Sequence, residues 1–160
     1  MLSIKYISID LVQDWILKLS DLETLMLKTN SIKAIPDLSL LGKLKELIIH
    51  SNNLPVSLVV PGYLRELELL SIYSYRKTEE FICPDNLKLQ RLVLYMNNIK
   101  KLHPSIYNLD SLEYLDLSNN QLSSIDLKRF KKLKKVIIAH NPIDDISSIK
   151  KKCNNIEVIF

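Results

Sequence analysis

The sequence contains very little glycine and cysteine and no long hydrophobic run. Its two glycines, Gly42 and Gly62, lie apart, whereas nucleotide-binding loops need clustered glycines that let backbone N–H groups approach the phosphates. The two cysteines, Cys83 and Cys153, follow no disulfide or metal-ligand spacing, which is typical of a reduced, intracellular protein. Apolar runs of only a few residues are too short to span a bilayer. These absences disfavour a nucleotide-binding enzyme, a disulfide-stapled domain and a transmembrane protein.

The N-terminal residues lack the features of a cleaved signal peptide. Asp10 and Asp14 interrupt the region that should be most apolar, and no small-residue cleavage site follows. We therefore expect a cytoplasmic protein, or an effector that is exported without a cleaved signal.

One pattern of apolar residues and asparagine recurs along the whole chain. It has the form apolar-x-x-apolar-x-apolar-x-x-Asn-x-apolar, and its repeat length of 20–25 residues indicates a solenoid. Leucine and isoleucine supply 50 of the 160 residues, enough for one continuous core. The five full copies are Leu22-Leu25-Leu27-Asn30-Ile32, Leu44-Leu47-Ile49-Asn52-Leu54, Leu89-Leu92-Leu94-Asn97-Ile99, Leu112-Leu115-Leu117-Asn120-Leu122 and Leu133-Val136-Ile138-Asn141-Ile143.

Three less regular copies complete the series. A degenerate copy, Leu64-Leu67-Leu69, has Ile72 where asparagine belongs, and partial copies stand at the two ends of the chain as Ile4-Ile7-Ile9 and Cys153-Ile156-Val158. This pattern resembles the leucine-rich repeat family, whose consensus is LxxLxLxxNxL. The resemblance implies one α/β domain over residues 1–160, with about six repeats plus partial terminal repeats.

The repeat also predicts a structure on physical grounds. Its central apolar pair alternates with period two, which indicates a short strand with one buried face. Because each coil has an apolar edge that it cannot bury alone, neighbouring coils must stack into a curved solenoid with a parallel sheet of about eight strands on the concave face. The asparagines then form a ladder that satisfies backbone groups at each bend: Asn30, Asn52, Asn97, Asn120 and Asn141.

The segments that return from one strand to the next predict short helices and extended stretches on the convex face. Apolar residues with helical spacing follow Asp10, and Asp126 precedes a second predicted helix start. Ile35-Pro36 and His103-Pro104 favour extended or turn backbone. We expect residues 73–86 to form an irregular, bulging loop, because that coil lacks its asparagine.

The outward-facing positions of the predicted sheet are the candidate binding residues, because the inward positions are committed to packing. Several are large and apolar or aromatic, as in protein interfaces. Tyr95, Met96 and Tyr114, with Arg91 and Asp116, are expected at the centre of this face. The full predicted set is Met26, Ile48, Arg91, Val93, Tyr95, Met96, Tyr114, Asp116 and Ile137. The alternative is that such residues simply make good strands.

Catalytic and metal-binding arrangements are not predicted. Asp116, Ser118 and His140 fall on neighbouring strands, but no strained elbow, oxyanion hole or pocket accompanies them. His50 and His140 are separated by about four strand intervals, roughly 19 Å, and cannot share a metal ion. We expect a non-enzymatic protein without a cofactor or a bound metal.

A basic segment offers a second candidate function. The chain carries a net charge of +4, and residues 128–152 hold nine lysines and arginines against Asp144 and Asp145. In the predicted stacking, their side chains form a basic ridge along the edge where strands begin, suited to anionic lipid, nucleic acid or an acidic protein. The few interleaved aromatics disfavour nucleic acid. The ridge consists of Lys131, Lys132, Lys134, Lys135, Lys151 and Lys152.

The sequence therefore predicts a protein–protein interaction module, an adaptor or effector, that binds a protein partner through its concave sheet. The alternative is a charge-driven membrane or nucleic-acid binder that uses the basic ridge. A further hypothesis is weak self-association through the apolar C-terminal strand, Ile156 to Phe160.

Overall fold

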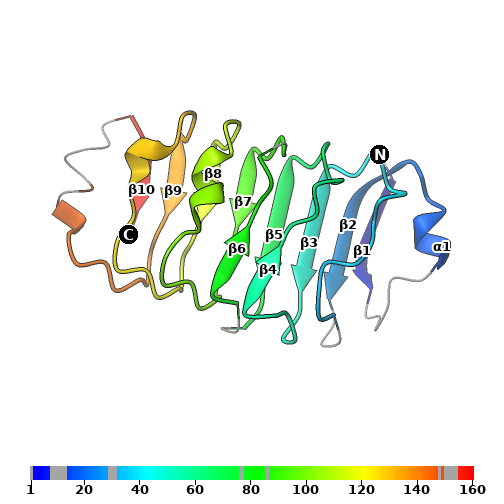
Figure 1. Ribbon diagram of the computed structural model, residues 1–160, viewed down its shortest axis with the longest axis horizontal. Coiled ribbons are helices and arrows are strands. Elements are labelled where there is room, and N and C mark those ends of the chain that lie inside the picture. The colour runs from blue at the N-terminus through cyan, green and yellow to red at the C-terminus, as the bar shows by residue number, and fades with distance from the viewer. Residues whose placement is uncertain are drawn as a thin grey trace.

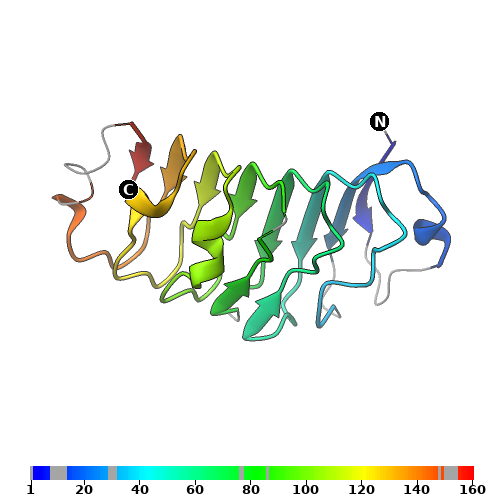
Figure 2. The same ribbon diagram turned by 45° about the horizontal axis from the view of Figure 1, so that its top comes forward.

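The computed structural model is a solenoid in which successive coils of the chain stack side by side (Figure 1). It describes residues 2–7, 14–28, 32–75, 78–85, 87–147, 149 and 155–160, with the backbone alone for residues 2–7. Each coil contributes one strand to an eight-stranded parallel sheet, and the chain returns across the opposite side of the molecule. Figure 2 shows the sheet along one side of the stack and the return segments along the other.

The main sheet follows chain order, as stacking of repeats requires. Because a parallel connection needs a crossover, each strand is joined to the next through its return segment. Within the described ranges its strands are β1 (Leu2–Ile7), β2 (Leu22–Lys28), β3 (Glu46–His50), β5 (Leu69–Tyr73), β7 (Arg91–Val93), β8 (Tyr114–Asp116), β9 (Lys135–Ile137) and β10 (Glu157–Ile159).

The inward side chains of these strands form one continuous hydrophobic core. In register across the sheet, each coil from β2 to β9 contributes a residue with no solvent exposure. Truncation of such a leucine to alanine typically costs about 2–5 kcal/mol, so this row holds neighbouring coils together. The row consists of Leu25, Leu47, Leu70, Leu92, Leu115 and Val136.

The convex side contains short helices, as predicted, but also a second small sheet. One turn of helix, α1 (Asp14–Leu17), lies after β1, and the 3₁₀ helix η2 (Leu127–Arg129) begins at Asp126, whose carboxylate accepts from the N–H of Lys128. None of the helices in the described ranges has the length and apolarity needed to cross a membrane.

Two segments of the convex side depart in part from the expectations. His103 is extended as predicted, but Pro104 opens a 3₁₀ helix, η1 (Pro104–Asn108), because proline fits the first helical position, where its missing N–H has no partner to lose. The segment 73–86 is not simply an irregular loop. Its residues Glu80–Ile82 form β6, which pairs in parallel with β4 (Ser57–Val59). Phe81 alternates inward between two half-buried neighbours, a pattern that the repeat frame did not reveal.

The asparagine ladder is present in the second half of the solenoid. The side-chain amide of Asn120 donates to the carbonyls of Leu94 and Leu117, and its oxygen accepts from the N–H of Ile99. Asn97 and Asn141 likewise donate to the carbonyls of the preceding coil. Asn97 and Asn120 are almost completely buried.

The predicted ladder position of Asn52 is wrong, because its side chain is exposed. In that coil β3 continues its alternation to Ser51, which points inward and donates to the carbonyl of Ile32. In this coil Ser51 therefore makes the hydrogen bond to the backbone that was expected from Asn52. Asn30 lies outside the described residues.

The register of the degenerate copy also differs from the prediction. Leu70 pairs with Leu47 and Leu92, and Ile72 pairs with Ile49. The strand frame is therefore Leu67-Leu70-Ile72 rather than Leu64-Leu67-Leu69. Both frames satisfy the apolar pattern, but the observed one is three residues later and so exchanges the two faces of the strand.

The last strand is displaced as well. Glu157 pairs with Lys135 and Val158 with Val136, so this coil lies two residues later than predicted. A two-residue slip keeps every side chain on its face, and Ile156 still packs against the core.

Candidate functional site

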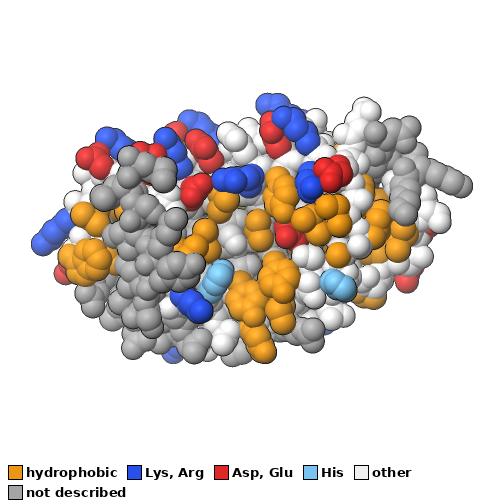
Figure 3. All heavy atoms as spheres, turned by 180° about the vertical axis from the view of Figure 1, so that it is seen from behind, with side chains coloured by type: hydrophobic (Ala, Val, Ile, Leu, Met, Phe, Trp, Pro, Cys, Tyr) orange, Lys and Arg blue, Asp and Glu red, His pale blue; other side chains and the backbone are white. Residues whose placement is uncertain are grey.

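The outward side chains of the main sheet form the surface that we call the concave face. Strand pairing aligns them in rows that cross the strands. Figure 3 views this face and shows hydrophobic side chains gathered at its centre, with histidines on either side. The middle row is Met26, Ile48, Ser71, Val93, Asp116 and Ile137, and the row toward the strand ends begins Lys28, His50, Tyr73 and continues to Tyr95.

The structure brings three predicted residues together at the centre of this face. Val93 and Tyr95 from the β7 coil and Asp116 from β8 line one hollow. Met26, Ile48 and Ile137 occupy the same row on β2, β3 and β9 and are half-buried. Arg91 and Tyr114 are paired neighbours in the row nearer the strand starts.

Met96 does not lie on the strand as expected. Its φ is 55°, in the left-handed region, and Asn119 and His140 have φ values of 57° and 56° at the same point of the next coils. These residues turn the chain off the sheet, so Met96 is half-buried at a bend instead of forming part of the strand surface.

Sequence reasoning missed the main feature of the concave face, a cluster of four aromatic rings. The Tyr73 ring stacks on that of Tyr95, with 5.9 Å between centroids and 16° between planes. His50 and Tyr75 meet Tyr73 edge-on, at centroid distances of 5.4 and 6.0 Å. We call His50, Tyr73, Tyr75 and Tyr95 the aromatic cluster.

The signal for this cluster was present in the sequence. With Leu67-Leu70-Ile72 as the frame, Tyr73 falls in the same row as His50 and Tyr95. The frame chosen above placed Glu68 and Leu70 on the face and left Tyr73 in a loop. Two exposed rings of the cluster, Tyr75 and Tyr95, are 58% and 39% accessible, which is high for aromatic side chains.

Two shallow hollows flank the aromatic cluster. The first, about 400 Å³, is bounded by Tyr73, Val93 and Tyr95, with Asp116 at its far end. Ser71, the small residue between Ile48 and Val93 in the middle row, also lines this hollow. The second, about 300 Å³, lies between the cluster and Lys28, with Asn52 at its margin.

Neither His50 nor Tyr73 adds a charge to the aromatic cluster at neutral pH. Burial, with the nearby charge of Lys28, lowers the pKa of His50 below its ordinary value of 6.5. Burial, with the neighbouring hydroxyls of Tyr75 and Tyr95, raises the pKa of Tyr73. The charges that bear on the two hollows therefore come from their ends, Lys28 and Asp116.

Polar contacts cross the strand starts beside the cluster. Arg91 donates to Glu46 over the intervening strand β5, at 3.1 Å, and Thr24 donates to the other oxygen of Glu46. Burial and the adjacent Asp116 carboxylate raise the pKa of Tyr114, which stays neutral between Arg91 and Lys135.

Carboxylates accompany the predicted basic ridge. Lys131 pairs with Asp110 at 2.8 Å and Lys134 with Glu113 at 2.7 Å, each on the preceding coil, while Lys135 pairs with Glu157 on the following strand. Lys132 is exposed, and Lys151 and Lys152 lie outside the described residues.

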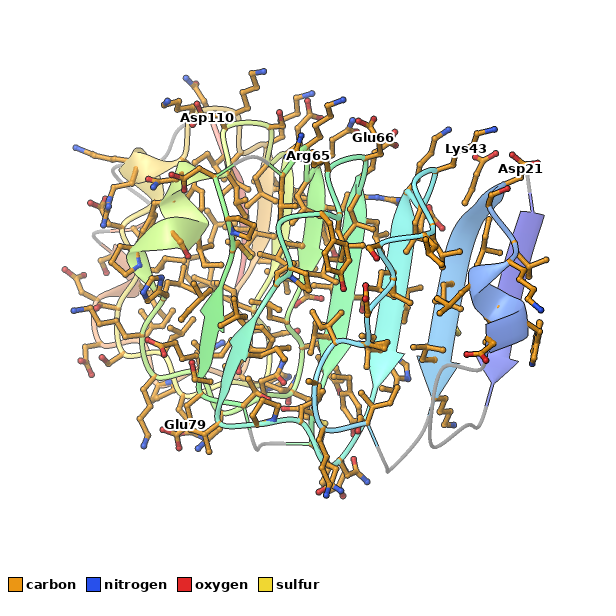
Figure 4. All side chains as sticks on the ribbon, turned by 45° about the vertical axis from the view of Figure 1, so that its right-hand side comes forward. Asp21, Lys43, Arg65, Glu66, Glu79 and Asp110 are labelled. Carbon is orange, nitrogen blue, oxygen red and sulfur yellow. The ribbon has the colours of Figure 1, made fainter. Side chains whose placement is uncertain are left out.

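The same pairing recurs in the described coils farther along the edge where strands begin. Lys43 meets Asp21, and Lys88 meets Glu66, at spacings of 22 residues. Figure 4 shows Asp21, Lys43, Glu66 and Asp110 along this edge and Glu79 on the opposite one. The edge thus carries alternating charge of both signs over most of its length.

Ser118 and Cys83, whose side chains could act as nucleophiles, are both buried. The Ser118 hydroxyl donates to the Asp116 carboxylate. Burial raises the pKa of the Cys83 thiol to about 12, so it is a poor nucleophile. In the described part of the chain, no three histidine, cysteine or carboxylate side chains are grouped so that they could hold a metal ion.

Comparisons with known proteins agree with this architecture. The sequence pattern of the leucine rich repeat family matches residues 87–143. A leucine-rich repeat protein of Leptospira interrogans superimposes with a TM-score of 0.67 at 23% identity, and an internalin, InlF, of Listeria monocytogenes with 0.68 at 20%. Both alignments cover 99% of this chain and 47% of the other. No curated protein sequence matches the chain.

A third solved structure has a more distant likeness. The functional domain of InlJ from Listeria monocytogenes, whose structure includes a cysteine ladder, aligns with a TM-score of 0.54 at 18% identity. This alignment covers 92% of the present chain and 36% of that domain. The chain therefore spans less than half the length of each of these three solved proteins.

These matches confirm the predicted resemblance: the chain folds as a leucine-rich repeat solenoid. This fold is typically a scaffold for protein–protein interaction, and such proteins are typically non-enzymatic binding modules.

Proposed function

We propose that this protein binds a protein partner through its concave face, with the aromatic cluster at the centre of the contact. The observation that carries the proposal is the combination of exposed tyrosines with two adjoining hollows. Aromatic residues are enriched in protein interfaces because they offer a large contact area and a polar tip at little entropic cost. The half-buried Val93, Ile48 and Met26 extend the apolar surface along the middle row.

The geometry of the rings supports a binding role over a purely structural one. Tyr73 is half-buried, and its ring contacts three other rings, which restrict its position. Tyr95 has one face against Tyr73 and remains exposed on its other side. A rigid centre bordered by accessible aromatic surface is the usual anatomy of an energetic hot spot.

The basic ridge supports a charge-driven contact less well. Three of its four described lysines already have carboxylate partners. Exposed pairs of this kind contribute little to stability, yet they cancel much of the positive potential that a phosphate-bearing surface would require.

Two tyrosines with nearly equal exposure, one on each side of the molecule, provide the test. Tyr95 on the concave face is 39% accessible, and Tyr63 on the convex side is 40% accessible. Each is replaced in turn by the photoreactive residue benzoylphenylalanine, and cells expressing the variant are irradiated. We expect covalent protein adducts through position 95 and none through position 63.

Two double variants complete this experiment. Tyr73→Ala/Tyr95→Ala should abolish capture by a crosslinker placed at Val93, whereas Lys131→Glu/Lys132→Glu should leave it intact. Circular dichroism establishes that both variants remain folded. Equal labelling from positions 95 and 63, or capture that depends only on the lysines, would refute the proposal.

A further inference from the structure

The two hollows beside the aromatic cluster end in opposite charges. Lys28 bounds the outer end of one hollow and Asp116 the outer end of the other, with Tyr73 and His50 between them. We propose that this groove binds an extended, proline-containing peptide segment with an acidic side chain at the Lys28 end and a basic side chain at the Asp116 end. This inference rests on the proposed protein-binding function and specifies the chemistry of the partner.

The aromatic rings favour proline. Proline-rich segments adopt the polyproline II conformation before binding, so they lose little entropy, and they pack their rings between aromatic side chains. The first hollow is lined by the rings of Tyr73 and Tyr95, by Val93 and by the small Ser71. These apolar walls are suited to a compact ring that makes no demand for buried hydrogen bonds.

The length of the groove sets the length of the peptide. From β2, which bears Lys28, to β8, which bears Asp116, there are four strand intervals. At about 4.8 Å per interval this is roughly 19 Å. A polyproline II helix rises about 3.1 Å per residue, so the two charged side chains should stand roughly six residues apart.

The charges distinguish a peptide from other ligands. A neutral oligosaccharide would also stack on tyrosines, but it would offer no opposite charge to Lys28 or Asp116. A phosphate-rich surface would be repelled by Asp116 at the centre of the face. A segment that carries both signs of charge satisfies both ends at once.

The test uses synthetic peptides and the intact chain. The probe has a glutamate, five prolines and an arginine, with capped ends. Three comparison peptides replace the prolines by alternating glycine and serine, the glutamate by glutamine, or the arginine by glutamine. Binding is followed by the tyrosine ring and backbone amide NMR signals of the ¹³C,¹⁵N-labelled protein, including the amide of Ser71.

One variant fills the first hollow and another repeats the same change elsewhere. Ser71→Ile continues the row of Ile48 and Val93 and suits a strand. Ser57→Ile makes the same replacement on the exposed strand β4 of the convex side. We expect Ser71→Ile to weaken binding of the proline peptide about tenfold, and Ser57→Ile to leave it unchanged.

Each charged end is tested with a substitution in the protein and two peptides, one with the opposite charge and one with glutamine in its place. Lys28→Gln should weaken the glutamate peptide about threefold and leave the glutamine peptide unaffected. Asp116→Asn keeps an acceptor for the N–H of Ser118. It should weaken the arginine peptide about threefold and leave the peptide with glutamine in place of arginine unaffected. The inference would be overturned if the glycine–serine peptide bound as tightly as the proline peptide. It would also be overturned if a neutral oligosaccharide, but not the proline peptide, shifted the same NMR signals. If photocrosslinking from position 95 still captures a protein, the broader proposal survives that result.

Discussion

The hydroxyl of Ser74 donates a hydrogen bond to Oδ1 of Asn97 across the boundary between two coils. Both residues are buried, and the same hydroxyl accepts from the N–H of Thr78. Asn97 in turn donates to the carbonyl of Ile72. Ser74 thus completes the ladder in the coil that has no asparagine of its own.

This contact predicts strong coupling between the two residues. Ser74→Ala and Asn97→Ala should each lower the free energy of unfolding by about 1–3 kcal/mol, because each leaves a buried polar partner unsatisfied. The double variant should cost less than the sum of the two, since the shared bond is lost only once. Urea denaturation of the four proteins measures this, and strict additivity would contradict the shared network. Ser57→Ala, which removes an exposed hydroxyl, is the control.

The difference between two asparagines in the same sequence frame gives a second prediction. Asn120→Ala should cost about 1–3 kcal/mol of unfolding free energy, because its buried amide and oxygen bond to backbone groups of neighbouring coils. Asn52→Ala should change stability by less than about 0.5 kcal/mol, because its side chain is exposed. Thermal unfolding of both variants compares them directly. Similar losses at the two positions would show that Asn52 belongs to the ladder after all.

The carboxylates along the strand-start edge predict how the lysines behave toward polyanions. In the variant Asp110→Asn/Glu113→Gln, Lys131 and Lys134 lose their partners. This protein should elute from a heparin column at higher salt than the wild type, because unpaired lysines release more counterions. The matched variant Asp21→Asn/Glu66→Gln makes the same change in charge farther along the edge and separates a local effect from net charge. Unchanged elution of the first variant would show that the pairs do not mask the ridge.

The environment of His50 predicts a pH effect with a definite sign. Its pKa is lowered in the folded state by burial and by Lys28, so the unfolded chain binds the proton more readily as pH falls below about 6.5. The contribution of His50 therefore leaves stability unchanged above that pH and reduces it as the pH falls toward the folded pKa. NMR titration of the His50 ring should show a midpoint below 6.5. Lys28→Gln should move this midpoint upward, while Lys18→Gln, on the remote helix α1 region, should not.

The periodic part of the fold was predictable from the sequence because its signal repeats. Leu92, Leu115 and Val136 recur with the same neighbours, and each occurrence supports the others. This period alone predicts the buried rows of leucine, the parallel order of the strands and the inward-facing asparagines. The small sheet formed by β4 and β6 does not, since it depends on two return segments that have no counterpart in the other coils.

The site was harder to predict because it lies where the repeat is least regular. Leucines at positions 64, 67, 69 and 70 satisfy two overlapping frames, and pattern alone does not choose between them. The choice is made by pairing in three dimensions, where Leu70 and Ile72 both reach the core without solvent exposure. Tyr73 is assigned to the surface only once that choice is made. Tyr95 and Asp116, which lie in regular coils, were placed correctly on the concave face.

The pairing of β4 with β6 has a consequence for the opposite side of the molecule. These strands belong to the coils of β3 and β5, which carry His50 and Tyr73, so the two coils are hydrogen-bonded to each other along both walls of the solenoid. Three rings of the aromatic cluster, those of His50, Tyr73 and Tyr75, therefore belong to two coils that are joined on both sides of the solenoid. We expect a partner that binds there to spend little of its interaction free energy on ordering this surface.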